Sequence, residues 1–153
     1  MARILYGSFD EHRIELLRLN QQGAGIFFTV NATDGRGRSG INITKIRAVF
    51  VDLDGAPLDP IYNAPLEPHL IVQSSQGKYH AYWIVEGLPL DQFTSTQKLL
   101  AKQFQGDSKV CDLPRVMRLP GFYHHKSEPY LTNVIQENHR RPYCFEVLLA
   151  AFK

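Results

Sequence analysis

The stretch Ala48-Val49-Phe50-Val51-Asp52-Leu53-Asp54-Gly55 joins a run of apolar, β-branched and aromatic residues to two aspartates at its end. Such a run predicts a β-strand, in which residues two apart point to the same side. The carboxylates of Asp52 and Asp54 would then lie roughly 5–7 Å apart on one face. At that separation they repel each other unless a cation lies between them, and their oxygens favour Mg²⁺ or Mn²⁺. The simpler alternative is that one aspartate only caps a turn before Gly55.

Length and composition predict one globular domain, residues 1–153, of a cytoplasmic protein. The chain has 153 residues, 44% of them hydrophobic and 21% charged, which excludes a disordered chain. A net charge of +2 permits a polyanionic partner without requiring one. Two cysteines suit a reducing compartment, and no segment is long enough to cross a membrane. Because structured segments lie close to both ends, we expect a domain excised from a longer protein.

Strand and helix signals mix without strict alternation, which predicts an α+β fold. Strands are expected at 26–30, 48–54, 70–72, 79–85 and 131–136, with the strand at 26–30 buried and a turn over 73–78 closing a hairpin. Helices are expected after a capping box at Ser8 and Glu11, at 91–104 and at 143–152, with a helical turn at 115–119. The polar, Gly-rich segment 31–42 is expected to be a mobile loop.

The predicted hairpin carries three candidates for binding phosphate. Ser74 and Lys78 lie in a turn rich in hydrogen-bond donors, which suits a phosphate cradle. His80 follows in the second strand, on the same face as Tyr82, and its imidazole donates to a phosphate oxygen whether protonated or neutral. A single strand histidine is more often a hydrogen-bonded core residue, so a role for His80 depends on the two aspartates.

Acidic and basic residues also follow the predicted helix at 91–104. Asp107 or Asp112 would complete a three-carboxylate metal site. Arg115 and Arg118 are three residues apart, so on a helical turn they would project from one face and bind a triphosphate or a nucleic-acid backbone. A solvated charged surface is the competing interpretation.

Two further basic residues stand beside the aromatic residues of the segment 122–126. His124 and Lys126 lie close to the two arginines in sequence, and base stacking with phosphate contact needs this mixture of side chains. The histidines of this segment are not at zinc-ligand spacing with either cysteine, which argues against a zinc site.

The whole pattern resembles the archaeo-eukaryotic primase superfamily, and more closely its RepB-like primase domains of plasmids and phages. The resemblance rests on Asp52-Leu53-Asp54, the segment 74–80, Asp107 and the run Arg-Val-Met-Arg-Leu-Pro-Gly at 115–121. It covers residues 19–126. It implies an RRM-like catalytic core in which an antiparallel or mixed sheet is flanked by helices. It also implies a DNA primase or primase-polymerase for plasmid, phage or mobile-element replication, which makes primers by two-metal nucleotidyl transfer.

The same resemblance implies roles for individual residues. Asp52, Asp54 and Asp107 would hold Mg²⁺ or Mn²⁺, with Asp112 as the alternative third acid. His80 would contact the phosphates of the incoming nucleoside triphosphate. Other phosphate or template contacts are expected from Ser74, Lys78, Arg115, Arg118, His124 and Lys126. The implied partners are a single-stranded DNA template, nucleoside triphosphates and a replicative helicase, fused or separate.

Two other functions compete with the primase. The segment 51–55 also resembles the first motif of haloacid-dehalogenase-type phosphatases, in which Asp52 would be the nucleophile and Asp54 an acid/base. Against this, a helix and a strand precede the motif, and Ala56 stands where that family usually has threonine. The second alternative is a primase-like module that binds DNA without catalysis.

Overall fold

The central sheet is built on the strand that carries the two aspartates. The computed structural model describes residues 2–153. Strand β4 (Ala48–Asp54) pairs antiparallel with β6 (Lys78–Glu86) along its whole length. On its other side β6 pairs with β5 (Leu70–Ser75), which pairs with β10 (Asn133–Glu137), and β11 (Tyr143–Cys144) runs parallel to the end of β6. The result is a five-stranded sheet with mixed pairing, so the predicted α+β class is confirmed.

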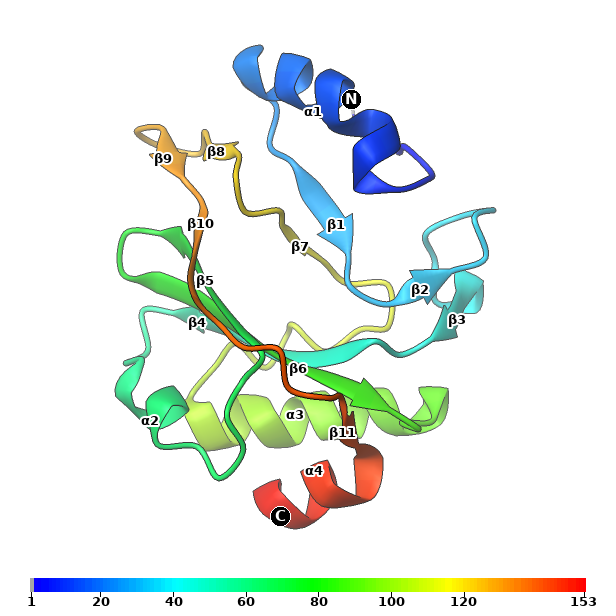
Figure 1. Ribbon diagram of the computed structural model, residues 1–153, viewed down its shortest axis with the longest axis vertical. Coiled ribbons are helices and arrows are strands. Elements are labelled where there is room, and N and C mark those ends of the chain that lie inside the picture. Colours follow the sequence, from blue (N-terminus) through cyan, green and yellow to red (C-terminus); the bar gives the residue numbers. More distant parts are fainter. Residues whose placement is uncertain (1) are drawn as a thin grey trace.

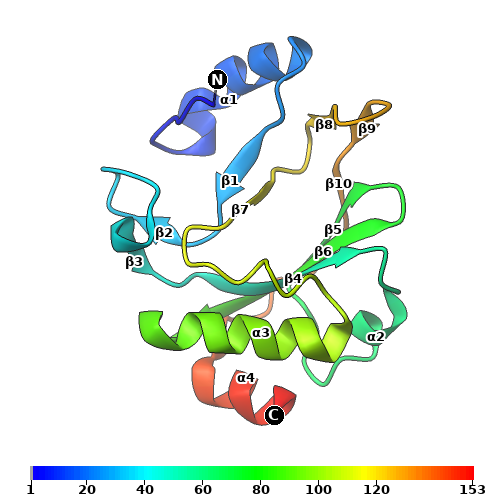
Figure 2. The same ribbon diagram turned by 180° about the vertical axis from the view of Figure 1, so that it is seen from behind.

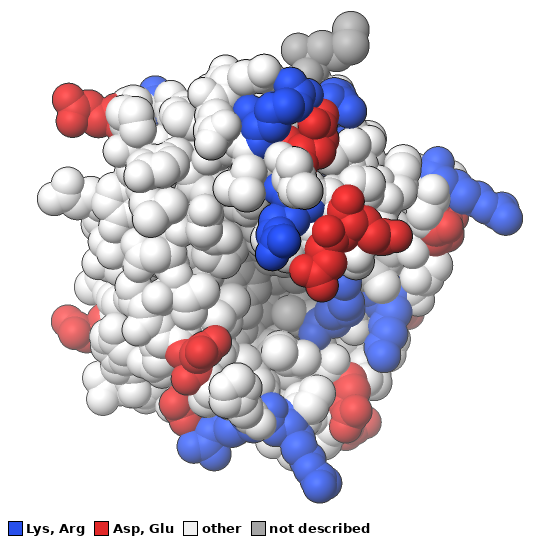
Figure 3. Space-filling model, turned by 45° about the horizontal axis from the view of Figure 1, so that its top comes forward, with Lys and Arg blue, Asp and Glu red and all other residues white. Residues whose placement is uncertain are grey.

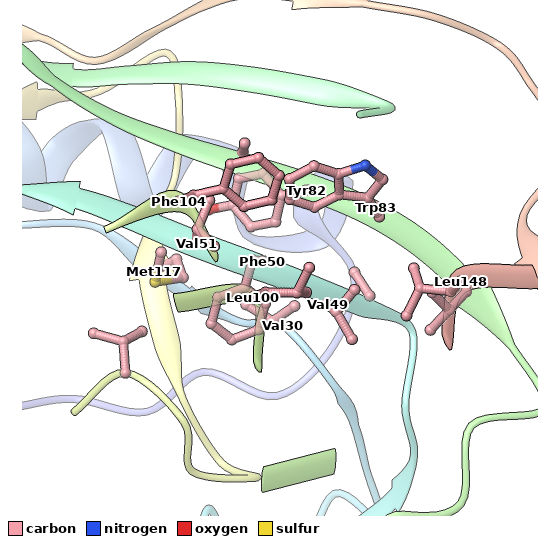
Figure 4. Packing of buried hydrophobic residues seen from close by; sticks show 14 of the residues in the cluster. Val30, Val49, Phe50, Val51, Tyr82, Trp83, Leu100, Phe104, Met117 and Leu148 are labelled. Carbon is pink, nitrogen blue, oxygen red and sulfur yellow. The ribbon is translucent and has the colours of Figure 1, made fainter. Parts of the chain in front are cut away.

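Two helices cover one face of this sheet (Figures 1 and 2). In α3 (Phe93–Phe104) the apolar residues recur at helical spacing and turn toward β4, and the helix ends at Gln105, which has a left-handed φ of 56°. Helix α4 (Phe145–Phe152) packs beside it. Trp83 of β6 stacks on Phe104 with ring centroids 5.6 Å apart, and Phe152 meets its edge at the same distance. Figure 4 shows this core.

A second layer lies over the opposite face of the sheet. It consists of helix α1 (Phe9–Gln21) and a two-stranded ribbon of β1 (Phe27–Thr29) and β7 (Val116–Arg118) (Figure 1). The ribbon turns Phe28 and Met117 inward. The ring centroid of Phe28 lies 6.2 Å from that of Tyr82 in β6. The remaining short elements are β2 (Ala32–Thr33), the 3-10 turn Gly40–Asn42, β3 (Ile43–Lys45), helix α2 (Asp59–Tyr62), the 3-10 turn Leu90–Gln92, β8 (Tyr123–His124) and β9 (Tyr130–Leu131).

The helical turn predicted at 115–119 is wrong, because residues 116–118 form strand β7. Phe27 pairs with Arg118 and Thr29 with Val116, although about ninety residues of chain separate the two strands. Pro114 and Pro120 bound the segment and leave too few residues for a stable helix. An available strand partner therefore decides the conformation. Arg115 precedes β7 and Arg118 ends it, so the two arginines do not project from one helical face.

Three other predictions need correction in detail. The strand expected to be buried at 26–30 is buried on one side only, with Phe27 exposed. The turn predicted over 73–78 is shorter, because β5 continues to Ser75 and β6 begins at Lys78. The segment 31–42, expected to be a loop, contains β2, which pairs with β3, and the Asp34 carboxylate accepts a hydrogen bond from the Arg36 amide at 2.8 Å. The capping box at Ser8 is confirmed.

A buried glutamine closes the free edge of the sheet at β4. Gln97 of α3 is fully buried; its side-chain oxygen accepts from the Phe50 amide at 2.9 Å. Its Nε2 donates to the carbonyl oxygens of Phe50 and Val110, both at 3.1 Å. Further along the same edge, the amide of Asp107 donates to the carbonyl of Asp52 at 2.9 Å. The segment 107–110 is thereby tied to the strand that carries the aspartates.

Candidate active site

One cleft of about 230 Å³ gathers nearly all the residues that the sequence predicted for metal and phosphate binding. It lies between the sheet and the β1–β7 ribbon. Its lining includes Asp52, Asp54, Ser74, Lys78, His80, Arg115, Arg118, His124 and Lys126. Figure 3 shows one face of the molecule, on which basic and acidic side chains lie near a hollow. Asp107 and its alternative, Asp112, do not line the cleft.

The two aspartates sit on one face of β4 in different electrostatic surroundings. Pairing places Asp52 opposite His80 and Asp54 opposite Lys78. Burial, together with the negative charges of Asp54 and Asp107, raises the pKa of Asp52 to about 6. The Lys78 ammonium, 2.6 Å from the Asp54 carboxylate, lowers the pKa of Asp54. A partly buried carboxylate beside other anions is a place where a cation is strongly stabilised.

His80 faces Asp52 as a neutral imidazole with a defined tautomer. Burial lowers the pKa of His80 to about 4, with a smaller effect from Arg118, so its 3.5 Å contact with Asp52 is no ion pair at neutral pH. The buried hydroxyl of Tyr82 lies 3.4 Å from His80 Nδ1. Because a buried hydroxyl needs an acceptor for its proton, Nδ1 accepts from Tyr82. The ring proton therefore resides on Nε2, which points toward Asp52 and the cleft.

Replacing Tyr82 with phenylalanine is expected to remove the hydrogen bond that fixes this tautomer. In wild-type protein at pH 7.5, ¹⁵N NMR of the His80 ring should show the Nε2–H form, whereas Tyr82→Phe should show a substantial Nδ1–H population. Loss of one neutral hydrogen bond, worth about 1 kcal/mol, should weaken binding of a phosphate-bearing ligand in the cleft about 5-fold. Tyr79→Phe, on the opposite face of β6, is the control. An unchanged tautomer in Tyr82→Phe would contradict the assignment.

Basic side chains form one wall of the cleft, which we call the basic wall: Lys78, Arg118, His124 and Lys126. Partial burial and the nearby cations lower the pKa of His124. Its buried Nδ1 finds no hydrogen-bond partner among residues 2–153. Four basic side chains gathered at one cleft indicate a place for an anion with hydrogen-bonding oxygens. Phosphate groups meet that description.

Ser74 supports the hairpin that carries this wall. A bulge between Gln73 and Ser75 shifts the register, and the Ser74 hydroxyl donates to the carbonyl of Lys78 at 3.4 Å. The Thr132 hydroxyl donates to the carbonyl of Ser74 at 3.1 Å and so ties the hairpin to the segment between β9 and β10. Ser74 is buried and Ser75 is half-buried at the cleft. The expected phosphate cradle is therefore a strand end rather than a loose turn.

Arg115 reaches the cleft while paired with an acid. Its Nε donates to Asp112 at 2.7 Å, and its Nη2 donates to the carbonyl of Lys109 at 2.9 Å. The Asp107 carboxylate accepts from the amide of Lys109 at 2.9 Å and is exposed. Within residues 2–153, the structure forms no cluster of three or more acidic, histidine or cysteine side chains close enough for a metal. The two aspartates of β4 come together as expected, and the identity of a third acid stays a prediction.

Sequence reasoning missed several cleft residues, of which Phe27 is the most prominent. The others are Ser75, Val110, Val116 and Met117. Phe27 and Phe28 read alike in the sequence, and only the pairing of β1 with β7 decides that one turns inward and the other toward the cleft. No local signal distinguishes them.

Comparisons with known proteins agree with this geometry. Residues 43–148 match the family model of the RepB DNA-primase N-terminal domain. The chain is 26% identical to a replication protein of Clostridium perfringens; the alignment covers 86% of this chain and 37% of that protein. The chain therefore spans little more than a third of the length of this curated relative. No helix among residues 2–153 is long and apolar enough to cross a membrane.

Two solved structures share the fold. The AEP domain of the cyanophage S-2L primase-polymerase has a TM-score of 0.76 at 20% identity, over 91% of this chain and 76% of that one. The catalytic domain of primase RepB′, in complex with initiator DNA, has a TM-score of 0.64 at 20% identity. The alignment covers 86% of this chain and 66% of that one. The family match includes the aspartates, the hairpin and the arginines. The chain thus belongs to the family of RepB DNA-primase N-terminal domains.

Proposed function

We propose that residues 1–153 form a primase catalytic domain that joins nucleotides into primers on single-stranded DNA. One observation carries this proposal. Asp52 and Asp54 lie on one strand face, directly opposite His80 and Lys78, in a cleft that also holds the basic wall. A pair of carboxylates beside a phosphate-binding wall is the arrangement that phosphoryl transfer requires.

The donor set fits a hard divalent cation. Asp52 and Asp54 supply carboxylate oxygens, and the raised pKa of Asp52 marks a site where positive charge is favoured. We propose that both hold Mg²⁺ or Mn²⁺, with Asp107 as third acid and Asp112 as the alternative. When bound, such ions lower the pKa of an attacking 3′-hydroxyl and neutralise the leaving pyrophosphate.

The remaining cleft residues orient the triphosphate. His80 donates from Nε2 to a phosphate oxygen, and its neutral state avoids competition with the cation for Asp52. Lys78 and Arg118 neutralise phosphate charge, and His124 lines the same basic wall. Holding the triphosphate in line with the attacking hydroxyl lowers the barrier mainly through positioning.

Primer synthesis tests the proposal directly. The purified protein is incubated with single-stranded DNA, labelled nucleotides and Mg²⁺ or Mn²⁺, and the products are resolved on a gel. Short oligonucleotides are the expected result. Phosphate release from a generic phosphomonoester without oligonucleotides would favour the phosphatase alternative. DNA binding with neither product would favour the non-catalytic module.

The chain matches only part of its curated relative, so the partners of a larger replication protein are also proposals. We propose a single-stranded DNA template and nucleoside triphosphates as ligands of the cleft. A replicative helicase, fused or separate, would supply that template by opening the duplex. Activity of this domain alone, compared with a longer protein, is the measurement that separates these contributions.

A further inference from the structure

The aromatic ring of Phe27 lies in the wall of the cleft and takes no part in the chemistry described above. Its side chain is 48% exposed and lines the same cleft as Asp52 and His80. The neighbouring Phe28 packs inward against Tyr82. Alternation of this kind follows from a strand with one buried face. Core packing therefore accounts for Phe28 and leaves Phe27 without a structural role.

Arg118 and Gly25 hold the Phe27 ring in place. Phe27 and Arg118 are direct partners across β1 and β7, and the guanidinium carbon lies 4.7 Å from the ring centroid, within cation–π reach. A Cβ atom on Gly25 would come within 2.9 Å of the ring and 3.2 Å of Arg118 Nη1. The missing side chain lets ring and guanidinium lie close against the backbone, so the ring sits at a set position with Arg118 over one face, while Phe27 as a whole stays 48% exposed.

The position of the ring relative to the basic wall indicates its ligand. Arg118 contacts the ring and also belongs to the basic wall, in the same cleft as His80. A nucleotide carries a flat base at one end and phosphates at the other. An open aromatic ring next to a cationic wall matches both ends at once, because bases stack on aromatic rings while cations bind phosphates.

We propose that Phe27 is a stacking platform for a nucleobase whose phosphates lie at the basic wall. The inference rests on the proposed function, because it takes a nucleotide to occupy the cleft. The base belongs either to the incoming nucleoside triphosphate or to the template strand, since both present the same flat π-face. Stacking on a ring discriminates little between bases, so the platform serves any sequence.

Fluorescence provides a direct test through Phe27→Trp. The chain has a single tryptophan, Trp83, which is fully buried and shielded from ligands. The fluorescence of the new indole in the cleft should be quenched when a base stacks on it. We expect quenching by ATP or by a single-stranded oligonucleotide, and none by inorganic tripolyphosphate or an abasic oligonucleotide. Quenching by ATP alone would assign the incoming nucleotide, and quenching by the oligonucleotide alone would assign the template.

Affinities of truncation variants provide the second test. Phe27→Ala should weaken binding of the quenching ligand on the order of 10-fold and leave tripolyphosphate binding unchanged within about 2-fold. Phe27→Leu, which keeps apolar volume but no π-face, should behave like Phe27→Ala. Tyr62→Ala is the matched control, because Tyr62 is 53% exposed on α2 and does not line the cleft.

The outcomes separate the platform from the proposed primase activity. Equal weakening of nucleotide and tripolyphosphate binding would mean that Phe27 only supports Arg118, and would overturn the inference. Unchanged affinity in both Phe27 variants would overturn it as well, even if primers are made. Base-dependent quenching without primer synthesis would support the platform while the catalytic proposal fails.

Discussion

Changing Asp52 to asparagine is expected to abolish primer synthesis while the folded protein becomes more stable. The substitution keeps the shape of the side chain and removes its charge. Stabilisation of developing charge by a carboxylate-bound cation is worth several kcal/mol, so we expect a loss of about 1,000-fold or more. Binding of single-stranded DNA should be retained, because it depends on cationic and aromatic side chains rather than on Asp52. Gel analysis of primers and a DNA-binding titration measure the two effects.

The gain in stability follows from the pKa of Asp52. Burial raises this pKa from 3.8 to about 6, so the folded state binds the proton more tightly than the unfolded state. Ionised Asp52 therefore costs stability, and the cost appears as pH rises from 3.8 through 6. In metal-free buffer at pH 7.5, Asp52→Asn should raise the free energy of unfolding by about 1–3 kcal/mol. Below pH 4 the difference should vanish.

A matched control separates the role of this carboxylate from a general effect of charge. Asp91→Asn removes an exposed carboxylate outside the cleft and should change neither synthesis nor stability appreciably. If Asp52→Asn retains more than about a tenth of wild-type synthesis, Asp52 does not hold a catalytic cation. Loss of both synthesis and DNA binding would instead indicate that the variant is misfolded.

Changing Gln97 to leucine is expected to cause the largest loss of stability. Leucine is similar in size but leaves three buried backbone groups without partners: the amide and carbonyl of Phe50 and the carbonyl of Val110. Each orphaned group costs about 1–3 kcal/mol, so the free energy of unfolding should fall by about 3–5 kcal/mol. Urea unfolding with an unchanged m-value measures this effect.

Gln103→Leu in the same helix is the control for this prediction. Gln103 is exposed, so its replacement should change stability by less than about 0.5 kcal/mol. Hydrogen exchange adds a local measurement, because the Phe50 amide should lose protection in Gln97→Leu before the amides of β6 do. A loss below about 1 kcal/mol would show that Gln97 does not secure the edge of β4.

The parts of the fold that the sequence predicted correctly are those fixed by local patterns. The run that ends at Asp52 and Asp54 gave the right strand, and alternation in the hairpin placed His80 and Tyr82 on one face. Capping at Ser8 marked the first helix correctly. Each of these signals lies within about a dozen residues, where turn chemistry and side-chain period decide the conformation.

The incorrect predictions share a dependence on distant partners. Strand β7 forms because β1 lies beside it, and nothing between Arg115 and Leu119 shows that partner. The same pairing sends Phe27 to the cleft. Gln97 resembles any polar helix residue until α3 packs against the unpaired edge of β4. Tertiary contacts of this kind override local preference, and a single sequence does not contain them.

The most direct test of the central claim is whether the template dictates the product. Wild-type protein is given homopolymeric single-stranded DNA templates, Mn²⁺ or Mg²⁺ and all four labelled nucleotides in turn. We predict that only the complementary nucleotide enters the oligonucleotides, and that changing the template changes the nucleotide accordingly. Products that form without template, or that ignore its sequence, would contradict the assignment of the cleft as a primase active site.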